Sequence, residues 1–224
     1  MNRYQSAMSR AAHQSVPMNK VLKNTYMLLS ATLIWSALLA SVSMALSPPP
    51  FISLLTSIGA LVLLWFVLPR TANSNAGLGM VFLITGLLGF GLGPTLNFYA
   101  AIPNGGQIIA TAFGGTGLIF IGLSAYALTS QRDFSFLGGF LFIGLMVVLV
   151  ASLVGIFVQM PALQLTISAA VVLLMSGLIL FETSQIIRGG ETNYIMATVS
   201  LYLSIINLFQ ALLHLLGAFG SNND

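Results

Sequence analysis

The chain has 224 residues, of which 57% are hydrophobic and only 5% charged, with a mean hydropathy of +0.98. Soluble domains carry about 25% charged residues, so this composition excludes a soluble protein and indicates an integral membrane protein with one membrane domain. The formal charge of +3 is too small to indicate a nucleic-acid partner. The absence of cysteine excludes disulfide scaffolds, thiolate metal sites and thiol catalysis.

The first segment, residues 1–24, is predicted to be a basic cytoplasmic tail. It carries Arg3, Arg10, Lys20 and Lys23 and no acidic residue. The apolar run that follows continues to Leu46, which is longer than the 7 to 15 residues or so of a signal-peptide core, and no A-x-A cleavage site follows it. We therefore expect a retained first helix.

Apolar runs of about 20 residues, long enough for a helix to cross a hydrocarbon core about 30 Å thick, recur seven times. They are Thr25–Leu46, Phe51–Leu68, Leu78–Tyr99, Gln107–Thr129, Phe136–Phe157, Leu163–Ile187 and Tyr194–Phe219. Short turns separate them, so consecutive helices should be antiparallel neighbours. The sequence thus predicts an all-α membrane protein, a seven-transmembrane-helix bundle over residues 25–219, with a short non-cytoplasmic tail at 220–224.

The basic residues orient this bundle. With the N-terminus in the cytoplasm, Arg70, Arg132 and Arg188 fall in the second, fourth and sixth connections, which then also face the cytoplasm. The odd-numbered connections and the C-terminal tail contain no lysine or arginine, in agreement with the positive-inside rule. A re-entrant second span would move Arg132 and Arg188 to the other side, so six spans fit less well. The predicted orientation is N-in, C-out.

Small residues are frequent in the third and fourth spans, where helices could approach closely: Gly86, Gly89 and Gly93, then Gly114, Gly115 and Gly117. The G-x-x-x-G spacing of Gly89 and Gly93 fits a flexible gate or a dimer face. We favour tight packing inside one bundle, because small residues permit the close contact that drives helix association in lipid. Pro94 removes a backbone donor and is expected to kink or end the third helix.

The seventh span carries a polar stripe. Asn193, Ser200, Ser204, Asn207 and His214 stand at spacings of 7, 4, 3 and 7, which places them on one face of a helix. Polar side chains in a span turn away from lipid, so this face should look into the bundle or a water-filled cavity, with the seventh helix central. The stripe is either a conduction path or a set of hydrogen bonds to neighbouring helices, each contributing about 0.6 kcal/mol.

Glu182 is one of only four acidic residues and lies in the sixth predicted span. It precedes Arg188 by six residues, or about 9 Å along a helix, which puts it in the cytoplasmic third of the span. Six residues also separate the two side chains onto different faces, so a partner must come from another helix, water or a proton. One interpretation is a carboxylate that reaches the headgroup region; the other is a functional group held neutral by neutral donors.

Enzyme signatures do not occur in the sequence. It has no H-E-x-x-H, P-loop or G-x-S-x-G motif and no cluster of His, Asp and Glu at metal-ligand spacing, so we expect no catalytic residue, metal or cofactor. The adjacent Arg132 and Asp133 are interpreted as a solvated pair of loop charges.

Three segments in the second half carry a family resemblance: FETSQII at 181–187, GETNYI at 190–195 and SLYLSIINLF at 200–209. On these motifs the chain resembles the Bax inhibitor family, also called the transmembrane Bax inhibitor motif family, over nearly its whole length after about residue 16. DFSFLGG at 133–139 and KVLKNTY at 20–26 look closest to the proteobacterial branch. That branch includes an inner-membrane modulator of the membrane-anchored FtsH protease.

The resemblance implies a last helix surrounded by the other six, a bacterial inner-membrane location, and two activities. One is a pH-sensitive calcium leak, governed in other branches by an aspartate pair on the sixth and seventh helices; the other is regulation of FtsH. Glu182 aligns with the first of these acids, but Ser204 stands where calcium-leak members carry the second. Two close carboxylates share a proton, whereas a glutamate facing a serine meets only a hydrogen-bond donor.

The sequence therefore favours a non-enzymatic regulator in the lipid bilayer that binds the FtsH protease complex. A pH-sensitive channel for calcium or other cations, with Glu182 and Ser204 as proton-sensing or ion-sensing residues, is the alternative. A transporter of small solutes would require paired discontinuous helices, at which only the third span hints.

Overall fold

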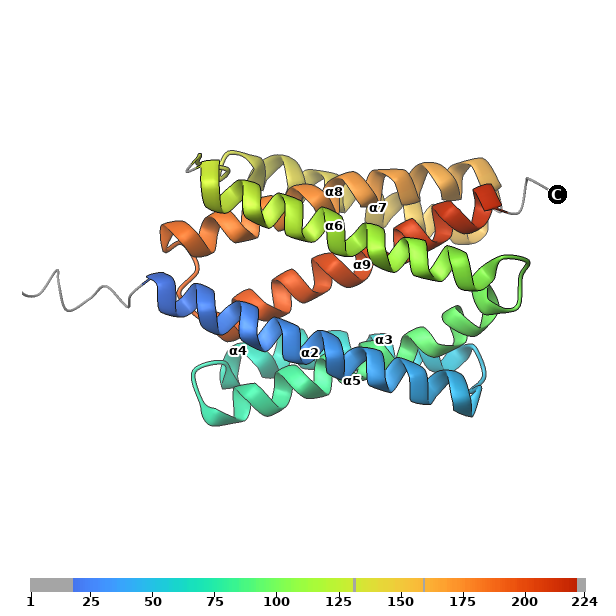
Figure 1. Ribbon diagram of the computed structural model, residues 1–224, viewed down its shortest axis with the longest axis horizontal. Coiled ribbons are helices and arrows are strands. Elements are labelled where there is room, and N and C mark those ends of the chain that lie inside the picture. The colour runs from blue at the N-terminus through green and yellow to red at the C-terminus, as the bar shows by residue number, and fades with distance from the viewer. Residues whose placement is uncertain (1–17, 131, 159, 221–224) are drawn as a thin grey trace, which may run out of the picture.

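The computed structural model describes residues 18–130, 132–158 and 160–220, and these form a helical bundle (Figure 1). The elements are α2 (Met18–Leu46), α3 (Phe51–Val62), the π-helix η1 (Leu63–Val67), α4 (Leu68–Thr71), α5 (Asn75–Ala100), α6 (Gly105–Ser130), α7 (Leu137–Phe157), α8 (Pro161–Arg188) and α9 (Tyr194–Gly220). Seven helical segments in these ranges are long and apolar enough to cross a membrane. The predicted all-α fold with seven spans is confirmed. Arg3, Arg10 and the tail at 221–224 lie outside the described residues.

The second span is continuous although it contains a proline. The segments α3, η1 and α4 follow one another without a break over Phe51–Thr71, which favours seven spans over a re-entrant second segment. Pro69 explains the π-helical turn before it, because its ring crowds the carbonyl of the residue four positions earlier, Trp65, and the turn widens in response. In contrast, Pro94 does not end the third span, since α5 continues to Ala100.

Helix α9 occupies the centre of the bundle. Figure 1 shows it crossing diagonally between a group formed by α2, α3, α4 and α5 and a group formed by α6, α7 and α8. It packs along α2, α5, α6 and α8. In an apolar 18-residue segment of α9, 56% of the residues are buried within the protein, against 6% in the corresponding segment of α7. The six other spans flank α9 as expected but contact it unequally, because α3 packs mainly on α5 and α7 on α8.

The described basic residues gather at one end of the bundle. The antiparallel order brings the start of α2 and the α4–α5, α6–α7 and α8–α9 connections to the same end, and the end of α9 to the other (Figure 1). Lys20, Lys23, Arg70, Arg132 and Arg188 all belong to the first end. This distribution is the one on which the predicted orientation rests.

Glycines bring α5 into close contact with α2. A Cβ atom on Gly89 would overlap the backbone of Ser36, and one on Gly93 would overlap Ser43. The interpretation of these two glycines as packing residues is confirmed. It is wrong for α6, where a Cβ on Gly114 or Gly117 would meet no atom within 4 Å. These α6 glycines have the composition of a close helix contact, but open space surrounds them.

Substitution by alanine should distinguish the packed glycines of α5 from the glycines of α6 that have open space around them. Gly89→Ala or Gly93→Ala forces α2 away from α5 and should destabilise the purified protein by about 1 to 3 kcal/mol. Gly114→Ala and Gly117→Ala are matched controls with open space around the new methyl group, and they should leave the thermal unfolding midpoint in detergent nearly unchanged. Equal midpoints for all four variants would contradict the packing role.

Candidate functional site

Helix α8 ends two turns after its carboxylate. Gly189 adopts a left-handed conformation with φ of 75°, which glycine tolerates without strain, and the N–H of Gly190 donates to the Gln185 carbonyl at 2.9 Å. This end fixes the last two turns of α8, including Glu182, at the basic end of the bundle.

Glu182 meets a hydroxyl group on the central helix. The Oγ atom of Ser204 donates a hydrogen bond to Oε2 of Glu182 at 2.9 Å. Ser204 is only 2% exposed, and Glu182 is partly buried. The sixth and seventh spans are therefore joined through a carboxyl group and a hydroxyl group. The partner of Glu182 comes from another helix, as its spacing from Arg188 predicts.

The two residues after Glu182 attach the same turn of α8 to two further elements. Thr183 is fully buried, and its Oγ1 lies 3.4 Å from the hydroxyl oxygen of Tyr26 on α2. The Oγ of Ser184 accepts a hydrogen bond from the backbone N–H of Phe134 at 3.4 Å. Three consecutive residues thus connect α8 with α9, with α2 and with the α6–α7 connection.

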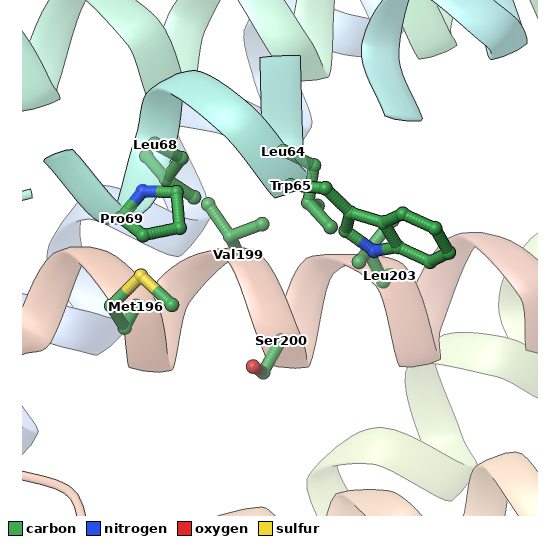
Figure 2. Close-up of a pocket in the computed structure, with 8 residues that line it drawn as sticks. All are labelled: Leu64, Trp65, Leu68, Pro69, Met196, Val199, Ser200 and Leu203. Carbon is green, nitrogen blue, oxygen red and sulfur yellow. The ribbon is translucent and has the colours of Figure 1, made fainter. Parts of the chain in front are cut away.

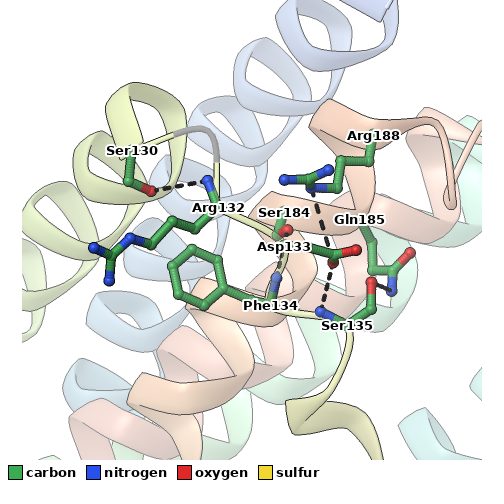
Figure 3. A network of polar contacts seen from close by, with 8 residues as sticks. All are labelled: Ser130, Arg132, Asp133, Phe134, Ser135, Ser184, Gln185 and Arg188. Carbon is green, nitrogen blue, oxygen red and sulfur yellow. Dashed lines mark hydrogen bonds and ion pairs between the residues drawn. The ribbon is translucent and has the colours of Figure 1, made fainter.

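Polar contacts dock the α6–α7 connection onto the end of α8 (Figure 3). Asp133 Oδ1 accepts from the N–H of Ser135 at 2.9 Å and lies 3.8 Å from Nε of Arg188, while Gln185 Nε2 donates to Ser135 Oγ at 3.2 Å. Hydrogen bonds from Ser135 and the Arg188 charge hold the pKa of Asp133 below its usual value. The ion-pair partner of Asp133 is Arg188 on α8, which corrects its interpretation as a loop pair with Arg132.

Asn193 has a capping role at the start of α9. Its Oδ1 accepts from the N–H groups of Ile195 at 2.9 Å and Met196 at 3.2 Å, as an N-cap side chain does. Its Nδ2 donates to the Ala72 carbonyl at 3.2 Å and to Asn73 Oδ1 at 2.8 Å. The first member of the predicted stripe therefore joins the α8–α9 connection to the α4–α5 turn.

The remaining stripe residues have different surroundings. His214 Nδ1 lies 2.8 Å from Ser168 Oγ on α8, near the opposite end of α9. Ser200 borders a cavity of about 250 Å³ between α9 and the η1–α4 segment, with its hydroxyl turned away from the apolar lining (Figure 2). Asn207 is exposed, so the stripe as a whole does not face the packed interior of the bundle. Because α9 crosses the bundle diagonally, a straight line of residues on it does not stay under one neighbour (Figure 1).

Among the predicted residues, the structure brings Glu182 and Ser204 together and leaves Asn193 and His214 towards opposite ends of α9. Sequence reasoning missed Tyr202, which is fully buried. Its hydroxyl donates to the Thr85 carbonyl on α5 at 3.1 Å and lies 2.6 Å from Ser36 Oγ on α2. The available signal was a tyrosine within a span, because a buried phenol needs a hydrogen-bond partner.

The fold and these contacts define a multi-pass α-helical membrane protein whose central helix is held by hydroxyl, amide and carboxyl side chains. A family model described as Inhibitor of apoptosis-promoting Bax1 matches residues 18–221. The chain belongs to the Bax inhibitor family.

Curated relatives are similar over most of their length. The chain is 52% identical over 199 residues to the Modulator of FtsH protease YccA of Escherichia coli strain K12, covering 89% of this chain and 90% of the relative. The Inner membrane protein YccA of Escherichia coli O6:H1 shows the same identity and coverage. An uncharacterized membrane protein of Vibrio cholerae is 50% identical over 224 residues, the full length of both chains.

The α6–α7 connection should loosen in acid. Since the folded pKa of Asp133 is lowered, its contribution is present above the unfolded value of about 3.9 and is lost as the pH falls through the folded value. Hydrogen exchange of the Ser135 amide, corrected for intrinsic rates, should lose protection over that range. Asp133→Asn should show lower protection without this transition, and an unchanged transition in the variant would assign the acid effect to another group.

Proposed function

We propose that this chain is a non-enzymatic regulator of the bacterial inner membrane that binds and modulates the FtsH protease complex. The observation that carries the proposal is the 52% identity to the Modulator of FtsH protease YccA over 89% of the chain. An alignment of 199 of the 224 residues is too long to reflect one isolated motif. The seven apolar helices and the name Inner membrane protein of a second relative support the location.

The surroundings of Glu182 favour regulation over conduction. The carboxyl group faces Ser204 and not a second carboxylate, so the pair cannot share a proton as two acids do. Calcium prefers six to eight oxygen ligands, often anionic, and the described residues contain no group of three His, Asp or Glu side chains that could hold a metal. A single Glu182 with one hydroxyl is a poor calcium site.

The basic end offers an ordered surface for a cytoplasmic partner. We orient the chain N-in and C-out, since the described cations lie at the end where α2 begins. There Asn193 joins two connections, and Asp133 and Arg188 join a third to the end of α8. In this orientation the start of α2, with Lys20 and Lys23, lies at the same cytoplasmic end, and the basic segment that precedes it can be presented to the protease.

The binding test uses the full chain in its native membrane. Affinity-tagged protein, extracted in mild detergent, should retain FtsH, and deletion of residues 1–16 should slow its own turnover by the protease or change that of other FtsH substrates. A matched variant in which those residues are replaced by a neutral polar segment of equal length separates charge from length. If FtsH is not retained and the deletion changes no turnover, the regulatory function is wrong.

A cation leak is the second candidate, favoured by the position of the Glu182–Ser204 contact inside two spans. Calcium-loaded vesicles containing the purified chain should leak no faster than protein-free vesicles between pH 5 and 8 if regulation is the only activity. Ser204→Asp restores a second acid and should introduce a pH-dependent leak, with Ser204→Ala as control. A leak by the native chain that Glu182→Gln abolishes would establish the channel instead.

A further inference from the structure

One face of α9 is only partly covered by the rest of the bundle: Met196 and Leu203 line the cavity against the η1–α4 segment, and His214 contacts Ser168 on α8. The members of this face are Met196, Ser200, Leu203, Asn207, Gln210 and His214, and their alternating spacings of four and three place them along one side of the helix. We call them the open face of α9. Among residues 200–214 of α9, only Asn207 and Gln210 are exposed, and both belong to this face.

The open face carries polar side chains at the depth in the membrane where their desolvation costs most. Asn207 is the middle residue of the span Tyr194–Gly220, so it lies near the centre of the hydrocarbon. Its Nδ2 donates to the Leu203 carbonyl on its own helix at 2.8 Å. Within the described residues, its Oδ1 atom and the Gln210 side chain have no hydrogen-bond partner. Lipid chains offer none, so an uncovered carboxamide there carries a desolvation cost.

Water does not resolve this cost well. A buried water needs two to four polar partners. The cavity of about 250 Å³ that adjoins the open face is lined by Ser200 and otherwise by apolar side chains, namely Leu64, Trp65, Leu68, Pro69, Met196, Val199 and Leu203 (Figure 2). The helices α3 and α7 also carry many exposed apolar residues, such as Leu61 and Val147. A water-filled crevice needs polar side chains on the surrounding helices as well as on α9.

We propose that the open face of α9 docks a transmembrane helix of the protease complex, one that carries small residues and a hydrogen-bonding side chain at mid-depth. A continuous line of residues at spacings of three and four is the shape that a second helix packs along. The amides of Asn207 and Gln210 supply the hydrogen bonds to the docked helix. The apolar members Met196 and Leu203 supply apolar contact with it. This inference rests on the proposed function, since it assigns that function its membrane surface.

The test uses the natural absence of cysteine from the chain, so that each introduced thiol is unique. Asn207→Cys and Gln210→Cys, labelled with a photoactivatable maleimide in native membranes, should form a covalent adduct with a subunit of the FtsH complex. Leu118→Cys on α6 and Val147→Cys on α7 are controls close to the middle of their own helices, with 75% and 62% exposed side chains. They should give several-fold less adduct.

Other outcomes overturn the proposal in distinguishable ways. Adducts between two copies of the chain would make the open face a homodimer surface, and rapid labelling of Asn207→Cys by a membrane-impermeant maleimide would make it an aqueous path. Equal adducts at all four positions, with FtsH still co-purifying, would reject the surface and keep the regulator. Loss of co-purification by the unmodified chain would reject both.

A second variant separates docking from folding. Asn207→Leu and Gln210→Leu remove no hydrogen bond between helices of the bundle, only the exposed bond of Asn207 to its own helix, so the thermal unfolding midpoint of the purified protein should be unchanged or higher. Retention of FtsH should fall about threefold for each substitution and about eightfold for the pair, as expected for average hydrogen bonds between membrane helices. A lower midpoint with unchanged retention would show that the two amides serve the fold alone.

Discussion

The structure depends on the requirement that polar groups inside the hydrocarbon find partners within the protein. Helix α9 meets this requirement for its neighbours: Tyr202 reaches α2 and α5, Ser204 reaches Glu182 on α8, and Thr198 Oγ1 donates to the Thr25 carbonyl on α2 at 3.3 Å. Apolar contact alone gives membrane helices little preference for one neighbour, since lipid is equally apolar. These hydrogen bonds specify which faces of the surrounding helices turn towards α9, and the glycines of α5 allow α2 to approach closely enough.

The features that local chemistry determines could be predicted from the sequence, and those that depend on helix placement could not. Span length and the basic connections require no knowledge of neighbours, so the seven spans were predictable. The stripe on α9 was visible as a periodicity, but the diagonal path that leaves Asn207 exposed while Ser204 is buried is a property of the whole bundle. Similarly, Gly89 and Gly114 look alike in sequence, and only the positions of α2 and α6 distinguish a packed glycine from an exposed one.

The two ends of the bundle are organised differently. At the basic end, side chains join successive connections: Asn193 reaches the α4–α5 turn, and Ser184, Gln185 and Arg188 hold the α6–α7 connection. At the other end, Asn97 on α5 donates to the Met44 carbonyl of α2 at 3.0 Å, which joins two helices within one group. The contacts that link separate connections therefore concentrate at the end where α2 begins, which is the surface that we propose for a cytoplasmic partner.

The contact of Glu182 with Ser204, in place of a second carboxylate, and the open face of α9 both fit a protein that works by association with a partner. A carboxylate pair near the centre of a bundle costs desolvation energy, and a protonation switch can use that energy. One carboxyl group that accepts from a hydroxyl donor forms a satisfied contact, which gives no comparable driving force for a conformational change. Among the described residues, polar groups without a hydrogen-bond partner include the buried hydroxyls of Thr25, Ser43 and Ser124 and the exposed side chain of Gln210. With Asn207, Gln210 lies on the outside of the central helix near the middle of its span. The location of the exposed amides therefore points to a partner helix in the membrane as the element that completes the bundle.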